Sequence, residues 1–243
     1  MAETKSDIIK RLRREILPLE AFKTFVTSSD IDIKLGSLKN AFPNNRFPHG
    51  VIHEFLSFSE ENAAVTNGFI AALLASFMQN GNPVAWIGTH RRIFPPAFPA
   101  FGVTPDKILF VNLQKEKEML WAIEEALKCN GLAAVVGEVQ ELTFTASRRL
   151  QLAVEQSHVT GFILRNDPRK INTTASVARW KITSLPSELP DGLPGVGFPR
   201  WNVELLKIRN GKPGTWQIEF IGQQFRYINK IASIPQEQKK KTG

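Results

Sequence analysis

The sequence predicts an α/β fold in which a mostly parallel sheet is covered by helices and is finished by antiparallel strands. Short apolar runs alternate with longer segments of helical periodicity from residue 47 to residue 164. After Asp167 the apolar pattern changes to period two, which is typical of antiparallel strands. At 243 residues with 42% apolar residues, the chain can form one domain of about 200 residues with tails.

The first predicted element is an amphipathic helix over residues 6–25, within a segment that we delimit as residues 1–26. Its apolar positions at helical spacing are Ile8, Leu12, Ile16 and Leu19. Its basic residues lie elsewhere on the helix surface and are Lys10, Arg11, Arg13 and Arg14. The segment either packs on its own domain or forms a docking arm for a partner, and the sequence leaves both open. Residues 27–46 hold several turn formers and few periodic apolar positions, which predicts a linker.

The domain that we place at residues 47–230 begins with repeated strand–helix units. We expect strands at 51–55, 84–87, 108–112, 132–136 and 161–164, and helices at 64–80, 116–130 and 146–156. Gly81 and Pro83 end the first of these helices. Four prolines between residues 95 and 105 permit only short helical turns in that connection.

The antiparallel finish follows. We expect its strands at 177–182, 201–208 and 216–221, with residues 210–214 as the hairpin loop of the last two because its glycines can adopt positive φ. The segment 184–199 is rich in proline and glycine, which predicts a long surface excursion. The tail, residues 231–243, carries three consecutive lysines and is expected to be disordered.

Charge and residue usage narrow the function classes. The formal net charge of +8 is compatible with DNA or another polyanion, but such a surplus is also common in proteins that bind neither. The single cysteine, Cys129, excludes a disulfide framework, and we expect a buried apolar thiol there. The longest apolar stretch, residues 69–78, is too short to cross a bilayer, and no basic-then-apolar leader opens the chain. We therefore expect a soluble cytoplasmic protein with no membrane partner.

Neither a metal site nor a nucleotide site is predicted. His49 and His53 are four residues apart, but Pro48 and Gly50 deny them a helical face, so we expect a structural histidine at position 53. The loop at 56–68 occupies the place of a phosphate-binding P-loop. It has no lysine, its one glycine comes last, and its two consecutive glutamates would repel a triphosphate. We assign no cofactor and no nucleotide-binding residues, although the helix N-terminus leaves weak phosphate contact open.

Several segments nevertheless resemble known families. Residues 47–55, 80–87 and 101–110 resemble the P-loop lead-in, the second strand and the Leu-Gly-Val-Asp segment of RecA-type recombinases. Residues 120–129, 147–153, 178–180 and 199–205 are similar to the ImuA family, and the resemblance covers about residues 47–220. It implies a RecA-like three-layer fold and a role in SOS-induced, error-prone translesion synthesis. The partners that it implies are ImuB, a non-catalytic relative of Y-family polymerases, and an error-prone DnaE-type polymerase.

The same resemblance indicates which ATPase elements are missing. After the second strand, where a RecA-type enzyme places a water-activating glutamate, the chain reads Ile87-Gly88-Thr89-His90. At the Walker B aspartate it has Gly137, with Glu138 one residue late, so that a slip of one residue could restore a carboxylate there. The loops at 137–145 and 166–174 are short relative to the DNA-binding loops of RecA. We therefore expect no catalytic residues, no ATP hydrolysis and no RecA-like filament on DNA.

Basic residues of the later elements form a candidate face for DNA or an acidic partner. Of the pair Arg148 and Arg149, we expect one to be exposed and one to be ion-paired, with a shared phosphate or partner surface as the alternative. In Arg179-Trp180 and Arg200-Trp201, neighbouring strand residues face opposite sides, so we expect buried tryptophans beside exposed arginines rather than base-stacking platforms. The face would comprise Arg148, Arg149, Arg165, Arg179, Arg200, Lys207 and Arg209.

Together these patterns predict a non-catalytic RecA-like adaptor that binds an ImuB-like polymerase homologue, with RecA and DNA as further candidate partners. Two alternatives remain open at this point. One is a RecA-type ATPase with an atypical nucleotide loop. The other is a cell-division inhibitor of the SulA kind, a family of degenerate RecA-like proteins to which ImuA is similar.

Overall fold

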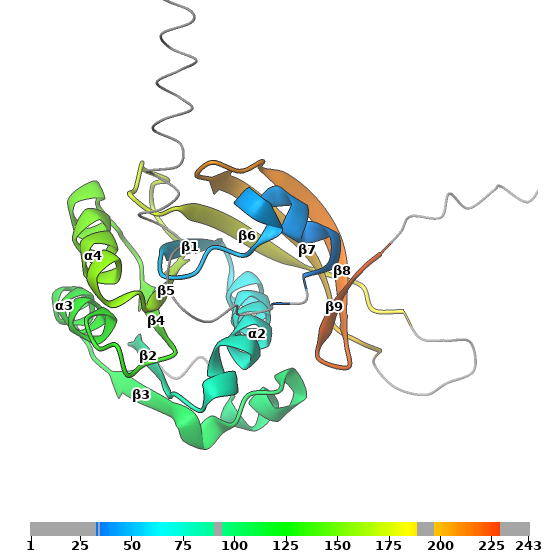
Figure 1. Cartoon of the computed structure of the whole chain (residues 1–243), viewed down its shortest axis with the longest axis horizontal. Helices are drawn as coiled ribbons and strands as arrows, with labels where there is room; N and C mark the ends of the chain where they lie inside the picture. The colour runs from blue at the N-terminus through cyan, green and yellow to red at the C-terminus, as the bar shows by residue number, and fades with distance from the viewer. Residues whose placement is uncertain (1–32, 34, 90–93, 189–196, 229–243) are drawn as a thin grey trace, which may run out of the picture.

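The computed structural model describes residue 33 and residues 35–89, 94–188 and 197–228 (Figure 1). Nine strands form one sheet in the order β3-β2-β4-β5-β1-β6-β7-β8-β9. The strands are β1 Ile52–Ser57, β2 Val84–Gly88, β3 Ile108–Asn112, β4 Ala134–Val139, β5 Thr160–Asn166, β6 Ala178–Leu185, β7 Arg200–Ile208, β8 Gly214–Ile221 and β9 Gln224–Tyr227. The helices are α2 Glu60–Phe77, α3 Glu116–Leu127 and α4 Phe144–Ser157, and the 3-10 turns are η1 Gly36–Ala41, η2 Pro43–Asn45, η3 Met78–Asn80, η4 Pro95–Phe101 and η5 Pro105–Lys107.

The sheet is parallel from β3 to β6 and antiparallel from β6 to β9. In Figure 1, α2 lies inside the curve of the sheet, whereas α3 and α4 lie on its outer face. Each face has its own hydrophobic core, with Phe55, Phe69 and Trp180 on the α2 side and Ile123 and Val154 on the side of α3 and α4. The predicted three-layer α/β class with antiparallel closing strands is therefore confirmed.

The predicted elements are present, with shifted ends. Helix α2 begins at Glu60, four residues earlier than predicted, because the Ser59 hydroxyl caps it by accepting from the amide of Asn62. Helix α3 ends at Leu127 instead of residue 130. Cys129 lies beyond that end and is exposed, so the prediction of a buried thiol is wrong. Strand β6, which was predicted to be antiparallel, is antiparallel to β7 on one side and parallel to β1 on the other.

The sequence did not predict β9. This strand forms a short hairpin with β8, and the residues between them, Gly222 and Gln223, both have positive φ. Only Phe225 of β9 is buried, so its period-two pattern was too brief to identify.

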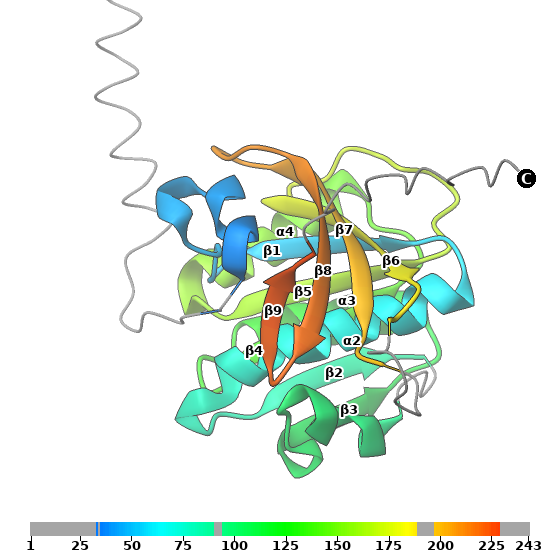
Figure 2. The ribbon, with the colours of Figure 1, turned by 90° about the vertical axis from the view of Figure 1, so that its right-hand side faces the viewer.

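The described part of the predicted linker belongs to the folded domain. Residues 35–46 form η1 and η2, and Leu35, Leu38, Ala41 and Phe42 are buried in the core on the α2 side. The amide of Lys212 in the β7–β8 hairpin donates to the carbonyl of Ala41. Figure 2 shows this lead-in, in dark blue, beside β9. The prediction of a linker is wrong here because 3-10 turns bury apolar residues without the periodicity of an α-helix.

Replacing Leu38 with alanine tests this correction. Leu38 is 1% exposed, so Leu38→Ala is expected to lower the free energy of unfolding by about 2–5 kcal/mol. Leu206→Ala, at a site that is 43% exposed in β7, is the control and should change it by less than about 1 kcal/mol. Urea denaturation measures both, and equal small losses would restore the linker interpretation.

Three of the predictions lie outside the described residues. They are the amphipathic helix within residues 1–26, with Ile8, Leu12, Ile16 and Leu19, the linker residues 27–32 and 34, and the tail at 231–243. Of the predicted surface excursion at 184–199, residues 189–196 are also outside. Among the described helices, none combines the length and the apolar character that crossing a bilayer requires.

Candidate functional site

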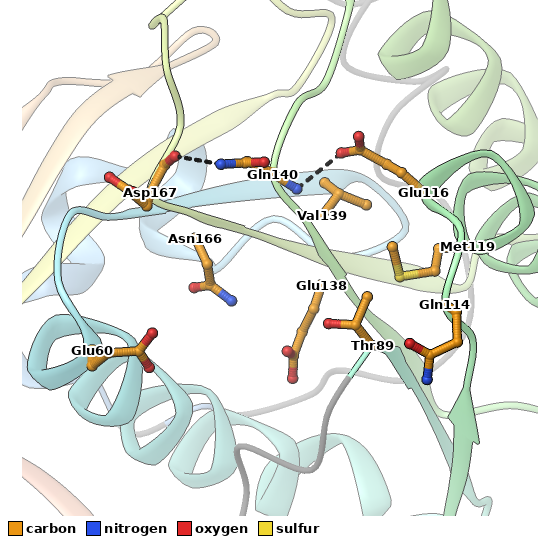
Figure 3. Close-up of a pocket in the computed structure, with 10 residues that line it drawn as sticks. All are labelled: Glu60, Thr89, Gln114, Glu116, Met119, Glu138, Val139, Gln140, Asn166 and Asp167. Atoms are coloured by element: carbon orange, nitrogen blue, oxygen red, sulfur yellow. Dashed lines mark hydrogen bonds between the residues drawn. The ribbon is translucent and has the colours of Figure 1, made fainter.

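A cavity of about 450 Å³ opens at the carboxyl ends of the central strands, where ligands bind in open parallel sheets (Figure 3). It lies between the start of α2 and the segments that follow β2, β3, β4 and β5. Its lining residues are Glu60, Thr89, Gln114, Glu116, Met119, Glu138, Val139, Gln140, Asn166 and Asp167. It is the part of this fold in which a nucleotide site would lie.

The connection between β1 and α2 is too short to cradle a phosphate chain. Strand β1 ends at Ser57 and α2 begins at Glu60, so only Phe58 and Ser59 join them. The cap at Ser59 already engages the amides of Asn62 and Ala63. A P-loop wraps several consecutive backbone amides around the phosphates, and its lysine and hydroxyl hold the β/γ-phosphates and magnesium. This connection has no lysine, and its one hydroxyl, that of Ser59, caps α2.

Glu138 is the carboxylate that β4 contributes to the cavity. Gly137 faces α3, where a Cβ would overlap the Ile123 side chain. Glu138 faces the opposite side of the sheet, is 5% exposed, and accepts a hydrogen bond from Trp86 Nε1 at 2.8 Å. Glu138, one residue after Gly137, is thus the carboxylate of β4 that faces the cavity. After β2, the cavity is lined by Thr89, which has no carboxylate.

The described part of the cavity lining is acidic. Among its described residues, Glu60, Glu116, Glu138 and Asp167 carry carboxylates and none is a lysine or arginine. Glu116 Oε1 accepts from the amides of Gln140 and Glu141, at 3.0 and 2.7 Å. Figure 3 shows Glu138 and Asn166 projecting into the space between these groups. The four carboxylates give the described lining a negative charge, which opposes the approach of a polyphosphate.

Metal ligation was not predicted from the sequence. Across the described ranges, no three His, Cys, Asp or Glu side chains gather in a way that could hold a metal ion. His53, the histidine expected to be structural, is fully buried in the core on the α2 side.

Two members of the predicted basic face are buried in an ion-pair network. Arg165 is fully buried, and its Nη1 lies 2.9 Å from Glu54 Oε1. Arg179 Nε lies 2.9 Å from the other oxygen of the same carboxylate, Glu54 Oε2. Glu54 is itself fully buried in β1 and also accepts from the hydroxyl of Thr174. The assignment of Arg165 and Arg179 to a binding surface is therefore wrong, since their charges are neutralised inside the domain.

The same network fixes the segment that runs from β5 to β6. Arg165 Nη2 donates to the carbonyl of Lys170 and pairs with Glu141. Arg179 Nη2 donates to the carbonyl of Asn172 at 2.6 Å. Residues 166–174, which the resemblance equated with a reduced DNA-binding loop, are thereby held against the sheet by buried charge-assisted hydrogen bonds.

The remaining basic residues do not form one continuous face. Arg200 pairs with Glu219 and Glu188, each at 2.8 Å. Arg149 pairs with Glu124 at 2.6 Å while Arg148 is exposed, as predicted for that pair.

Lys207 is the second-to-last residue of β7, and Arg209 directly follows the strand. Lys207 donates to the carbonyl of Thr174, and burial, followed by the nearby charge of Arg179, lowers its pKa. Arg209 is exposed. Of the seven predicted cations, Arg148, Lys207 and Arg209 remain for surface contacts.

The two arginine–tryptophan pairs confirm half of the prediction. Trp180 and Trp201 are buried, at 0% and 4% exposed. Arg179 and Arg200, expected to be exposed, have side chains that are only 13% exposed because carboxylates draw both of them inward.

His53 of β1 links residues 47–48, which precede that strand, to Trp180 of β6. Its Nε2 donates to the carbonyl of Pro48 at 2.7 Å, while its Nδ1 accepts from Trp180 Nε1 at 3.3 Å. The ring stacks on Phe47 with the ring centroids 4.5 Å apart. Burial lowers the pKa of His53 from 6.5 to about 4. The sequence prediction of a structural histidine agrees with these contacts.

Acid should therefore destabilise the fold through His53. In the unfolded chain this histidine takes up a proton near pH 6.5, whereas in the folded chain it does so only near pH 4. Stability from the neutral ring is present above pH 6.5 and falls by about 3 kcal/mol as the pH drops to 4. We expect His53→Gln to lose less stability than the wild type over this interval, as measured by urea denaturation at each pH. Parallel pH profiles would contradict the assignment.

Comparison with known proteins gives relatives of two kinds. No protein-family model matches the chain. Protein ImuA of Caulobacter vibrioides, from each of two strains, is 32% identical over 213 residues, which cover 81% of this chain and 87% of the relative. The cell division inhibitor SulA of Photorhabdus laumondii is 26% identical over 115 residues, which cover 47% of this chain and 64% of that protein.

Among solved structures, the crystal structure of the RadB recombinase superposes with a TM-score of 0.55 at 14% identity, covering 82% of this chain and all of that one. At this identity the likeness shows the fold alone. It agrees with the RecA-like architecture that the resemblance implied.

Proposed function

The chain belongs to the ImuA family, and from this premise we propose that it acts as a non-catalytic RecA-like adaptor in SOS-induced, error-prone translesion DNA synthesis. Its partner in this role is an ImuB-like polymerase homologue. The observation that carries the non-catalytic part of the proposal is the two-residue connection between β1 and α2, which opens on an acidic cavity.

This observation matters because phosphoryl transfer depends on positioned charge. Nucleotide hydrolysis requires a cradle for the β- and γ-phosphates, a bound magnesium ion and a residue that orients water. Here the cradle is replaced by the cap at Ser59, and the first turn of α2 carries Glu60 and Glu61. Glu138 alone recovers the position of one magnesium-binding carboxylate, and it is engaged with Trp86. A protein with this geometry acts through its surfaces.

Calorimetry tests the non-catalytic part. Titration with millimolar ATP and magnesium is expected to give no binding heat, with an active recombinase as the positive control. Saturable binding that Glu138→Gln abolishes would instead support the RecA-type ATPase alternative.

We propose that any DNA contact in this role uses those members of the predicted basic face that form no ion pair among the described residues. Two separate exposed cations, Arg148 of α4 and Arg209 directly after β7, are the basis of this part of the proposal. We expect weak binding of single-stranded DNA that falls steeply with salt. Arg148→Ser combined with Arg209→Ser should lower the affinity about tenfold at low salt. The control, Lys115→Ser with Lys128→Ser at the two ends of α3, removes the same charge and should leave the affinity unchanged, as measured by fluorescence anisotropy.

A second candidate is a cell-division inhibitor. The observation that favours it is the similarity to SulA, although this covers under half of the chain. Addition of the purified protein to the polymerising tubulin-like division protein distinguishes the two roles. The adaptor proposal predicts an unchanged polymerisation rate, whereas stoichiometric inhibition would favour the alternative.

A further inference from the structure

Helices α3 and α4 leave an apolar groove between them on the outer face of the sheet. The groove has a volume of about 450 Å³, and its apolar lining comes from Leu120 and Trp121 of α3 and from Ala146 and Leu150 of α4. This apolar lining distinguishes the groove from the cavity at the strand ends, whose described lining is acidic. The two helices pack against each other, and α3 covers β4 while α4 contacts β1, so the groove lies on the folded domain.

Trp121 is the unusual residue of this groove. Its side chain is 63% exposed, whereas Trp86, Trp180 and Trp201 are between 0% and 4% exposed. Met119, Ile123 and Leu127 already anchor α3 to the core, so the indole at position 121 is not needed to hold the helix. An exposed tryptophan beside an apolar groove is typical of the residues that contribute most to binding at protein interfaces.

Charged residues of both signs form the rim of the groove, namely Glu116, Glu124, Glu141, Lys117 and Arg149. Glu124 pairs with Arg149 and Lys128, and Glu141 pairs with Arg165. Glu116 accepts from two backbone amides and keeps its negative charge at the rim. An occupant that complements this groove has an apolar face flanked by basic residues, as an amphipathic helix can provide.

We propose that this groove binds residues 6–25 of the same chain. That segment has Ile8, Leu12 and Ile16 at helical spacing, and its basic cluster at residues 10–14 contains four cations and no acid. The apolar positions of the segment match the apolar floor of the groove, and the basic cluster supplies cations for Glu116 at the rim.

The chain is long enough for this contact. Residues 26–32 join the segment to Ile33, where the described structure begins. Seven residues reach up to about 25 Å, and twenty residues in a helix add about 30 Å. A domain of this size has a radius of gyration of about 16 Å, so the apolar face of the segment can reach the outer face of the sheet. Covalent connection also gives the segment a millimolar effective concentration at the groove.

Fluorescence quenching of the full-length protein tests the proposal. The signal of Trp121 is obtained as the difference between the wild type and Trp121→Phe, each titrated with acrylamide. In the double variant Ile8→Asp with Leu12→Asp, the quenching constant of Trp121 is expected to rise about threefold, because the cover that excludes water from the indole is lost. The control adds the same charges at polar positions of the segment, Ser6→Asp with Thr24→Asp, and should behave like the wild type.

Hydrogen exchange gives an independent readout on the same full-length proteins. Exchange of residues 116–124 and 143–150 is expected to accelerate in the Ile8→Asp, Leu12→Asp variant and to stay unchanged in the control. Quenching and exchange that are the same in all three proteins would overturn the proposal.

The other possible occupants give different results. If a second copy supplied the segment, shielding of Trp121 would increase with protein concentration and light scattering would show assembly. If a partner supplied it, shielding would appear only after an ImuB-like protein was added. Either result would overturn the assignment to the same chain, which predicts a shielded Trp121 in a monomer at all concentrations.

Discussion

Glu54→Ala is expected to lower the free energy of unfolding by about 3–5 kcal/mol. Glu54 lies in β1 with no exposed surface and neutralises two cations, Arg165 at 2.9 Å and Arg179 at 2.9 Å. Its removal would leave the fully buried guanidinium of Arg165 with Glu141, whose side chain is 36% exposed, as its remaining counter-charge among the described residues. It would also release Thr174 and the segment that follows β5. Urea denaturation monitored by circular dichroism measures the loss.

Two further variants make this prediction specific. Glu54→Gln keeps the volume of the side chain but cannot neutralise two guanidinium groups, so we expect it to retain most of the loss. Glu118→Ala removes an exposed ion pair with Lys115 and should cost less than about 1 kcal/mol. A loss below about 1 kcal/mol for Glu54→Ala would mean that Arg165 reaches solvent, as the basic-face prediction required.

Trp180→Ala is expected to cost a further large amount, about 3–5 kcal/mol. Trp180 is fully buried and stacks on Phe55 and Phe47, with ring centroids 5.9 and 6.2 Å away. Its Nε1 donates to Nδ1 of His53. Trp180 of β6 thus packs against β1 and against Phe47, which precedes β1. Its loss should weaken the packing of all three segments.

This variant also decides what the Arg179-Trp180 pair does. A tryptophan that stacks nucleic-acid bases would be exposed, and its removal would weaken DNA binding with little effect on stability. The buried position predicts the reverse, a large loss of stability with DNA affinity unchanged in the fraction that remains folded. Leu206→Ala, at a side chain that is 43% exposed in β7, serves as the control, with an expected stability change below about 1 kcal/mol.

The parallel part of the fold was predictable because its signals are local. Buried strands and amphipathic helices alternate with the periodicities of their own structures, and Gly81 marks the end of the first helical segment with φ of 82°. The confirmed predictions, including the short turns between β2 and β3, all rest on patterns within about twenty residues.

The charged network was not predictable in this way. Glu54 is 111 residues from Arg165 and 125 from Arg179. No local pattern indicates that these side chains meet, so the arginines were interpreted as surface residues. A glutamate inside an otherwise apolar strand, Ile52 to Leu56, was the available signal that buried cations lay opposite it. Similarly, only the pairing of β4 with its neighbours reveals that Glu138, and not Gly137, faces the cavity.

The central claim is that the chain works as an adaptor without nucleotide. The most direct measurement uses the full-length protein as bait in extracts of damage-treated cells, with ATP added or removed enzymatically. The account predicts recovery of an ImuB-like polymerase homologue in equal amounts under both conditions. Recovery only with ATP, or recovery of the division protein in its place, would contradict it.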